Sequence, residues 1–382
     1  MFAGDKLLRV PGPTPVPDRV ARAAARPMLW HRSPEFVELF RRVEAGLKRL
    51  FETESDVLMI AGSGTAAMES AVANLLSPGE EAIVLNGGKF GERWLELVQA
   101  FGARPREVKY AYGQGADPEA LDAALSQHPS AKVVFATHNE SSTAVLNDIE
   151  ALAKVARAHG ALIVVDAVSS LGGTPLPMDA WGIDVVVTGS QKCLMLPPGL
   201  SFVGVGPRAW EKAAESKGHR YYFDWKQYRR AAKNAESPYT SAVSLMFALD
   251  ESLAMLEEEG AEARFDRHRL MRDMVRAGLK ELGFTLFVEE RWASPTLTAA
   301  YGGGVDPDEL RKVVRKKTGV TFAGGQGELK GRIFRIGHMG AATPLDMVTT
   351  LAAIEIGLAE LGADVTFGKG VGRALEVWKS WR

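Results

Sequence analysis

Lys192 is the residue whose surroundings most favour covalent chemistry. It follows an apolar run at 183–189 that we expect to form a strand, and it precedes the largely apolar loop 193–199. An amine held between such segments is poorly hydrated, which lowers its pKa and makes it a better nucleophile toward a carbonyl carbon. A surface lysine whose stem lies along apolar neighbours would give the same pattern, so Lys192 alone leaves both interpretations open.

Asp166 and the turn 62–65 add two further groups. Asp166 stands at the end of an apolar run, where a lone carboxylate is costly unless it finds a partner, although it could also cap the following segment. The turn Gly62-Ser63-Gly64-Thr65 leads into a helical pattern, and its small residues allow a ligand to approach a helix N-terminus that attracts anions. It lacks the lysine of a P-loop, and by itself it could be an ordinary strand-to-helix turn.

These groups follow predicted strands that alternate with helices. We expect strands at 56–61, 81–86, 131–137, 161–168, 183–189 and 200–206, with helical spacing of apolar residues between them. Strands that are apolar on both faces predict an α/β fold with a mostly parallel central sheet covered by helices, which binds ligands at the carboxyl ends of its strands. The polar segment 135–143 lies at that edge too, although it could equally cap a helix that begins at Asp148.

The pattern changes near residue 245. Two long helical patterns lead into a shorter α+β region, and a helix is predicted from Thr343 to Leu361. We therefore expect an N-terminal segment at 1–17, a large domain at 18–245 and a smaller α+β C-terminal domain at 246–382. The tail 368–382 has the pattern of a final amphipathic helix.

A buried lysine, a buried carboxylate and an anion cradle are together the parts that pyridoxal phosphate requires. The aldehyde joins the lysine as a Schiff base, the phosphate binds the helix N-terminus, and the carboxylate keeps the pyridine nitrogen protonated. The spacing from Asp166 to Ser190-Gln191-Lys192 and Pro197-Pro198-Gly199, within 165–202, resembles the cofactor-lysine region of class V, fold-type I aminotransferases. It is most similar to the alanine–glyoxylate and serine–pyruvate (serine–glyoxylate) group. The resemblance extends through PGPTPVP, GSGTAAME, NGGKFGERW, HNESSTAVLND, SPYTSAVSL and RIFRIGHMG.

The resemblance implies a role for each matching residue. Lys192 would form the Schiff base with pyridoxal phosphate, and Asp166 would pair with the pyridine nitrogen. Phe90 would stack on the ring, unless it is a core aromatic residue, and Ser141 would lie near the phenolic oxygen. Arg335 would bind the substrate carboxylate, since its planar fork matches a carboxylate. The remaining cofactor-binding residues implied are Ser63, Gly64, Thr65, Ser190, Gln191 and, from a second subunit, Thr240.

The implied activity is a ping-pong transfer of an amino group from alanine or serine to glyoxylate or pyruvate. The resemblance also implies a homodimer with shared active sites, with the N-terminal segment 1–17 packed near each site. Phosphoserine and 2-aminoethylphosphonate transaminases of this fold stay open as alternatives, as does a binding protein of this fold without catalysis. Two departures from the family pattern could tune substrate size: Ala144 stands where the loop usually has glycine, and Phe90 where tryptophan often occurs.

Composition and motifs argue against several other classes. The 46 Lys and Arg residues balance 47 Asp and Glu residues, so nucleic acid or an anionic membrane is not the expected partner. The one cysteine, Cys193, excludes an internal disulfide and a multi-cysteine metal site, so we expect a cytoplasmic protein without a structural metal. A cysteine desulfurase would need its cysteine on a mobile loop. A nicotinamide dehydrogenase would need a GxGxxG turn after a strand, which is missing.

Overall fold

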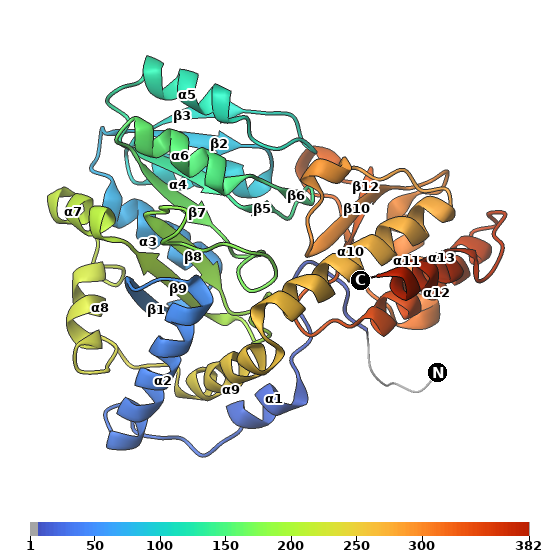
Figure 1. The fold of residues 1–382 in the computed structure, drawn as a ribbon, viewed down its shortest axis with the longest axis horizontal. Coiled ribbons are helices and arrows are strands. Elements are labelled where there is room, and N and C mark those ends of the chain that lie inside the picture. Colours follow the sequence, from blue (N-terminus) through green and yellow to red (C-terminus); the bar gives the residue numbers. More distant parts are fainter. Residues whose placement is uncertain (1–6, 382) are drawn as a thin grey trace.

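The computed structural model describes residues 7–381, so the first six residues of the predicted segment 1–17 lie outside it. Figure 1 shows a larger α/β part beside a smaller part, with the long helix α10 (Ala261–Glu281) running along the smaller one. The two parts are built on different sheets, of seven and three strands. A two-stranded hairpin, β5 (Asn139–Glu140) and β6 (Val145–Leu146), lies between β4 (Val133–Thr137) and α6 (Ile149–Ala158) in the chain.

The large sheet has the strand order β1-β9-β8-β7-β4-β2-β3. The neighbouring pairs β8–β7, β7–β4, β4–β2 and β2–β3 are parallel, whereas β9 runs antiparallel to both β8 and β1. The predicted, mostly parallel sheet is therefore confirmed. Its strands are β1 (Asp56–Gly62), β2 (Glu81–Asn86), β3 (Arg104–Lys109), β4 (Val133–Thr137), β7 (Leu162–Asp166), β8 (Val185–Gly189) and β9 (Gly199–Val205). The sequence analysis missed β3, because this edge strand is polar and pairs with β2 alone.

Helices cover both faces of this sheet. One face packs on α2 (Pro34–Phe51), α5 (Pro118–Gln127), α6 (Ile149–Ala158) and, through α2, on α9 (Val243–Glu259) and α1 (Asp18–Ala24). The other face packs on α3 (Gly64–Leu75), α4 (Lys89–Ala100), α7 (Pro207–Glu215) and α8 (Trp225–Ala232). Asp117 and Asp148 cap α5 and α6 through their side chains, and α6 is the helix expected to begin at Asp148.

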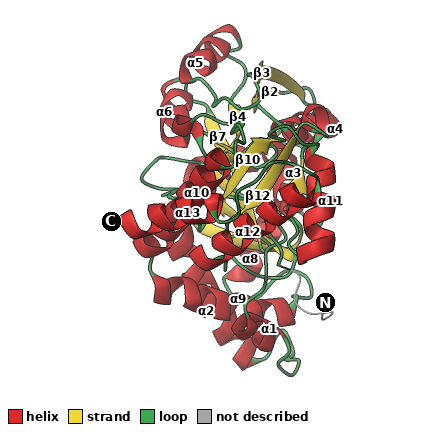
Figure 2. Cartoon of the chain, turned by 90° about the vertical axis from the view of Figure 1, so that its right-hand side faces the viewer, coloured by secondary structure: helices red, strands yellow, loops and turns green. Residues whose placement is uncertain are grey.

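The smaller part has its own core. An antiparallel sheet of order β10-β12-β11 is formed by β10 (Leu297–Tyr301), β11 (Ala323–Gly324) and β12 (Ile333–Gly337). Its core includes side chains from α10, α11 (Pro307–Thr318), α12 (Pro344–Glu360) and α13 (Lys369–Ser380), which lie on the near side in Figure 2. Two short 3₁₀ turns, η1 (Glu290–Trp292) and η2 (Gly327–Leu329), complete the part. The predicted helix at 343–361 and the tail helix are both confirmed, with Thr343 forming a capping box.

Two connections tie the parts together. The helices α9 and α10 meet at Gly260, whose φ of 78° and ψ of 151° break the helical path. At the other end of the chain, Leu8 forms a bridge with Thr321, and Gly337 of β12 donates its N–H to the carbonyl of Arg9. The residues that follow Arg9 then enter the larger part. Over residues 7–381, no helix combines the length and the apolar character that a membrane crossing requires.

Candidate active site

Lys192 lies just beyond the carboxyl end of β8, and its side chain is buried, with 9% of the residue exposed. The Nζ atom donates to the carbonyl of Pro11, and a Cβ added to Gly12 would lie 2.6 Å from that Nζ. The N-terminal segment therefore covers the lysine closely, and only glycine fits beside it. Burial lowers the pKa of Lys192 to about 8, opposed in part by the nearby charge of Asp166.

Asp166 ends β7, the strand next to β8 in the sheet, and it is 3% exposed. Its Oδ1 accepts a hydrogen bond of 2.8 Å from the N–H of Val168. Burial raises the pKa of Asp166 to about 7 although this bond and the charges of Arg93 and Lys192 act in the opposite direction. The lysine and the aspartate that the sequence singles out are thus brought to adjacent strand ends.

The turn 62–65 forms the start of α3 at the end of β1. Ser63 occupies the N-cap position without a side-chain capping bond, and Gly64 packs so tightly that an added Cβ would lie 2.7 Å from Cγ2 of Val168. A Cβ on Gly189, at the end of β8, would lie 3.2 Å from the N–H nitrogen of Gly64 and 3.0 Å from Oε1 of Gln191. The turn, Gln191 and the end of β8 therefore share one small volume.

The predicted residues Ser190 and Gln191 differ in how their side chains are used. The Ser190 hydroxyl is fully buried and donates to the carbonyl of Pro197 at 2.8 Å, so it holds its own loop. Oε1 of Gln191 is buried and has no hydrogen-bond partner within residues 7–381. A buried amide with an unused polar atom beside a helix N-terminus is suited to a further polar ligand.

Phe90 and Ser141 come from the two segments that face this edge of the sheet. Phe90 lies in the first turn of α4 and is half-buried, with the guanidinium carbon of Arg93 4.9 Å from its ring centre. Ser141 follows β5 and is buried. Ala144 ends the same loop with a φ of 68°, in the left-handed region that glycine favours, which agrees with glycine being the usual family residue there.

Arg335 reaches the site from the smaller part, in the middle of β12, and is 5% exposed. Its NH1 donates to the carbonyl of Ser141 at 2.6 Å and its Nε to the carbonyl of Gly324 at 2.9 Å. Burial lowers the pKa of Arg335 to about 10, which still keeps it charged at neutral pH. Its charge also lowers the pKa of Lys192, which agrees with the two groups lying near the same edge of the sheet.

Thr240 is exposed and lines a shallow hollow with Ala61, Leu200 and Tyr222, beside the turn that follows β1. An exposed position next to this turn is one that a second subunit could cover. Its predicted role stays a prediction.

The sequence analysis missed three parts of this site. Arg93 donates from NH1 to Oγ1 of Thr65 at 3.2 Å, and its position three residues after Phe90 on α4 was the signal that could have found it. Glu140 is a buried carboxylate, 1% exposed, and the sequence analysis covers it only as part of the polar segment 135–143. The resemblance implied that the N-terminal segment 1–17 packs near the site, but residue spacing does not encode that the carbonyl of Pro11 accepts from Lys192.

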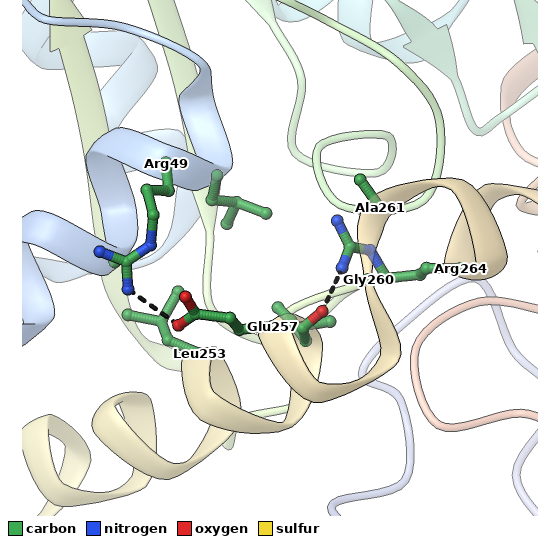
Figure 3. Close-up of a pocket in the computed structure, with 9 residues that line it drawn as sticks. Arg49, Leu253, Glu257, Gly260, Ala261 and Arg264 are labelled. Carbon is green, nitrogen blue, oxygen red and sulfur yellow. Dashed lines mark hydrogen bonds and ion pairs between the residues drawn. The ribbon is translucent and has the colours of Figure 1, made fainter.

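Two other features lie away from the site. A cavity of about 220 Å³ between α2 and the junction of α9 and α10 is lined by Arg49, Glu257 and Arg264, and Figure 3 shows Arg49 pointing toward Glu257. None of the predicted site residues lines it. Within residues 7–381, no three or more His, Cys, Asp or Glu side chains are grouped so that they could hold a metal ion.

These residues fit pyridoxal phosphate. The Gly64 turn offers a helix N-terminus for a phosphate, with the unused amide atom of Gln191 beside it. Lys192 supplies an amine of lowered pKa, and Asp166 supplies a buried carboxyl group on the neighbouring strand. The residues that would hold the cofactor thus lie at one edge of the sheet.

Comparison with known proteins agrees with this arrangement. The family model "Aminotransferase class-V" matches residues 18–328. The small subunit of a soluble hydrogenase from Synechococcus sp. is 43% identical over 376 residues, covering 97% of this chain and 98% of that protein. L-aspartate–glyoxylate aminotransferase of Paracoccus denitrificans is 33% identical over 377 residues, and serine–glyoxylate aminotransferase of Methylorubrum extorquens is 34% identical over 383 residues. Each of these two alignments covers 97% of this chain and 95% of the relative.

A solved structure extends the comparison to the fold. The crystal structure of ureidoglycine–glyoxylate aminotransferase from Bacillus subtilis superposes with a TM-score of 0.95 at 28% identity, and each chain is covered completely. The predicted family, the type I fold and the aminotransferase class are therefore confirmed. Class V aminotransferases use pyridoxal phosphate, which confirms the predicted cofactor. The chain belongs to the class V aminotransferase family, with the type I fold.

Proposed function

We propose that this aminotransferase moves the amino group of serine or alanine to glyoxylate or pyruvate. The observation that carries the proposal is one buried guanidinium, Arg335, which reaches from the smaller part to the carbonyl of Ser141 in the loop after β5. With the charge of Arg93 assigned to the phosphate-binding turn, Arg335 is the cation left for the substrate, which suits a substrate with one carboxylate. The three aminotransferases compared above all carry glyoxylate in their names, while their donors differ, which supports glyoxylate as an acceptor. A pyridoxamine–pyruvate transaminase of Mesorhizobium japonicum, 32% identical over 374 residues, supports pyruvate as the other.

Each residue has a defined task in the proposed reaction. Pyridoxal phosphate, when bound, supplies the carbonyl carbon that receives the amino group and a ring that withdraws electrons. Arg335 binds the α-carboxylate of the amino acid and orients its α-carbon toward Lys192. The neutral amine at Lys192 Nζ takes the α-proton and later returns it, which its lowered pKa favours. Asp166 holds a proton at the pyridine nitrogen, and Phe90 covers one face of the site.

The charges near the site support a small donor. Arg32 is a second cation in the N-terminal region, but it pairs with Glu236 at 2.7 Å on the surface. Arg93 donates to Thr65 in the phosphate-binding turn, so we assign its charge to the phosphate of the cofactor. Arg93 is also the one observation that favours a second candidate, a donor with an additional anionic group such as aspartate or phosphoserine.

The test of this proposal is a donor and acceptor panel read by absorption and turnover. The purified protein with pyridoxal phosphate is mixed with alanine, serine, aspartate, phosphoserine or 2-aminoethylphosphonate, and with glyoxylate or pyruvate as acceptor. We expect the visible absorption band of the protein to shift with alanine or serine, and turnover to be fastest with glyoxylate. A clear preference for aspartate or a phosphorylated donor would instead select the second candidate.

Arg335→Ala tests how the substrate is bound. Losing one partner of a desolvated charge pair typically costs about 2–5 kcal/mol, so kcat/KM should fall by a factor of roughly 30 or more for every carboxylate substrate. The absorption spectrum of the bound cofactor should stay that of the parent, since Arg335 does not bind it in this proposal. An unchanged kcat/KM would mean that another group binds the carboxylate.

We also propose that the protein acts as a homodimer in the cytoplasm. The support is that Thr240 lies on the surface beside the phosphate-binding turn, in a hollow shared with Tyr222. Large apolar side chains are also exposed, namely Met28 and Trp30 before α2, and Tyr221 before α8. Arg32 pairs with Glu236 after α8, and the hydroxyl of Tyr239 donates to the carbonyl of Tyr221, so these segments form one surface that a second subunit could cover.

A further inference from the structure

We infer that Glu140 is a positioning residue that holds Phe90 and Arg335 in the arrangement on which substrate binding depends. The inference rests on the proposed function for the roles of those two residues. Glu140 itself is 1% exposed, so it acts through its neighbours rather than on a substrate. No role for Glu140 followed from the sequence, although it lies in the polar segment 135–143.

The carboxylate of Glu140 ties the first turn of α4 to the loop after β5. Its Oε2 accepts from the backbone N–H groups of Phe90 at 3.0 Å and Gly91 at 3.1 Å. Its Oε1 accepts from the N–H of Ser142 at 3.1 Å and from the Ser142 hydroxyl at 2.5 Å. Both oxygens are thus used, each by two donors, which only a carboxylate at this position could accept together.

The two segments are also closely packed and joined by a further hydrogen bond. A Cβ added to Gly88 would lie 2.5 Å from Cδ of Glu140, and the N–H of Lys89 donates to the Ser142 hydroxyl at 3.0 Å. Burial raises the pKa of Glu140, while its hydrogen bonds and the positive end of α4 favour the charged form. The helix that carries Phe90 is therefore fixed to the loop by a buried, charge-assisted contact.

The same contact sets the position of Arg335. Ser141 lies between Glu140 and Ser142, and its carbonyl accepts the 2.6 Å hydrogen bond from NH1 of Arg335. Because the residues on both sides of Ser141 are bonded to each other, that carbonyl has a fixed direction. Glu140 thereby couples the residue proposed to cover the cofactor ring with the residue proposed to bind the substrate carboxylate.

The chain offers a matched control in Glu355. This buried carboxylate, 2% exposed, accepts from the backbone N–H groups of Gly368, Gly370 and Val371 at the start of α13. It makes the same kind of contact as Glu140, but within the smaller part and between α12 and α13. A variant at Glu355 therefore reports what the loss of such a contact does to stability alone.

The experiment compares Glu140→Gln with Glu355→Gln in the full chain. In the cofactor-free protein, Glu140→Gln should speed amide hydrogen exchange in peptides that contain 88–93 and 141–144. With cofactor bound, it should alter the visible circular dichroism band and lower kcat/KM about 10- to 100-fold, chiefly through KM, because hydrogen bonds to a charged group are lost. Glu355→Gln should lose comparable thermal stability and keep kcat/KM within about twofold of the parent.

The outcomes separate this inference from the proposed function. A Glu140→Gln protein with parental KM, kcat and circular dichroism would overturn the inference, as would equal kinetic losses in Glu355→Gln. If the parent binds pyridoxal phosphate but transfers no amino group, the proposed function fails, whereas the exchange and circular dichroism comparisons still decide the role of Glu140. Should Glu140→Gln not fold, Ser142→Ala removes one of the four hydrogen bonds to Glu140 and the bond from the N–H of Lys89, and it should raise KM by a smaller factor.

Discussion

At the scale of single residues, burial brings the pKa values of Lys192 and Asp166 close together. Burial lowers the first to about 8 and raises the second to about 7, and each group opposes the shift of the other through its charge. Near neutral pH both groups can therefore gain or lose a proton at little cost. This is the condition under which a side chain transfers protons most effectively.

The lowered pKa of Lys192 predicts how fast the cofactor-free protein captures pyridoxal phosphate. The neutral amine is the nucleophile, so the rate of capture should rise with pH through a midpoint near 8 and level off above it. The rate is measured from the change in visible absorption after mixing, across a pH series. A midpoint near the ordinary lysine value of 10.5 would show that Lys192 is not desolvated.

The raised pKa of Asp166 predicts that the stability of the folded protein falls as the pH rises. The folded state disfavours the ionised carboxylate, so the contribution of Asp166 to stability is present below the ordinary pKa of 3.8 and is lost as the pH rises toward about 7. At ~1.4 kcal/mol per pKa unit the loss is on the order of 4 kcal/mol at most.

Asp166→Asn removes this dependence on pH. The cofactor-free variant should become more stable relative to the parent as the pH rises through that window, as thermal unfolding at a series of pH values would show. Amino-group transfer should fall about 100-fold or more, since the pyridine nitrogen loses its charged partner. A variant that turns over like the parent would reduce Asp166 to a cap of the segment after β7.

At the scale of elements, the sequence was informative where apolar patterns fix a strand and uninformative where a loop does the positioning. Lys192 and Asp166 could be placed because each stands at or just after the carboxyl end of a buried strand. The carboxyl ends of neighbouring parallel strands lie at the same edge of the sheet. Arg93 contacts Thr65 at the start of α3, and only its helical spacing from Phe90 hinted at this position. Glu140 acts through contacts between α4 and the loop after β5, and no periodicity marks such contacts. The edge strand β3 was missed for a related reason, since its side chains are largely exposed to solvent and lack the apolar pattern of a buried strand.

The junction of α9 and α10 gives a prediction at this scale. Gly260 has φ 78° and ψ 151°, a conformation essentially reserved for glycine, and an added Cβ would meet nothing within 4 Å. Gly260→Ala should therefore lower the free energy of unfolding by about 1–3 kcal/mol through backbone strain alone. Next to it, Arg264 donates to the carbonyls of Gly172 and Leu256, so the strain would act where α10 is anchored to the larger part.

The control for this prediction is Gly372 in α13. It also has open space around its Cα, but it has an ordinary helical backbone, so Gly372→Ala should leave stability unchanged or raise it by about 0.5–1 kcal/mol. Both variants are compared with the parent by denaturant unfolding. Equal effects of the two substitutions would mean that the backbone at Gly260 relaxes into a conformation that alanine tolerates.

At the scale of the whole molecule, the site is assembled from segments far apart in the chain. The larger part supplies Lys192 and Asp166, the smaller part supplies Arg335, and the N-terminal segment supplies the carbonyl of Pro11. A movement of the smaller part would therefore change the distance between the substrate carboxylate and the reactive amine. Thr240 and Ser63 are predicted site residues that one chain leaves exposed, which makes the assembly of two chains the next question.

A pair of complementary variants tests whether Thr240 serves the site of a second subunit. Lys192→Ala should be inactive as a homodimer, and Thr240→Glu should bind pyridoxal phosphate weakly, because a carboxylate repels the phosphate. In a heterodimer of the two, one site combines both defects, whereas the other has the parental Lys192 of one subunit and the parental Thr240 of its partner. The heterodimer, purified through two different tags, should regain about half of the parental activity, since a symmetric dimer holds two equivalent sites.

If Thr240 instead serves the site of its own chain, both sites of the heterodimer carry one defect and no activity returns. Light scattering of the parent provides the companion measurement, and a fully active monomer would contradict the shared site.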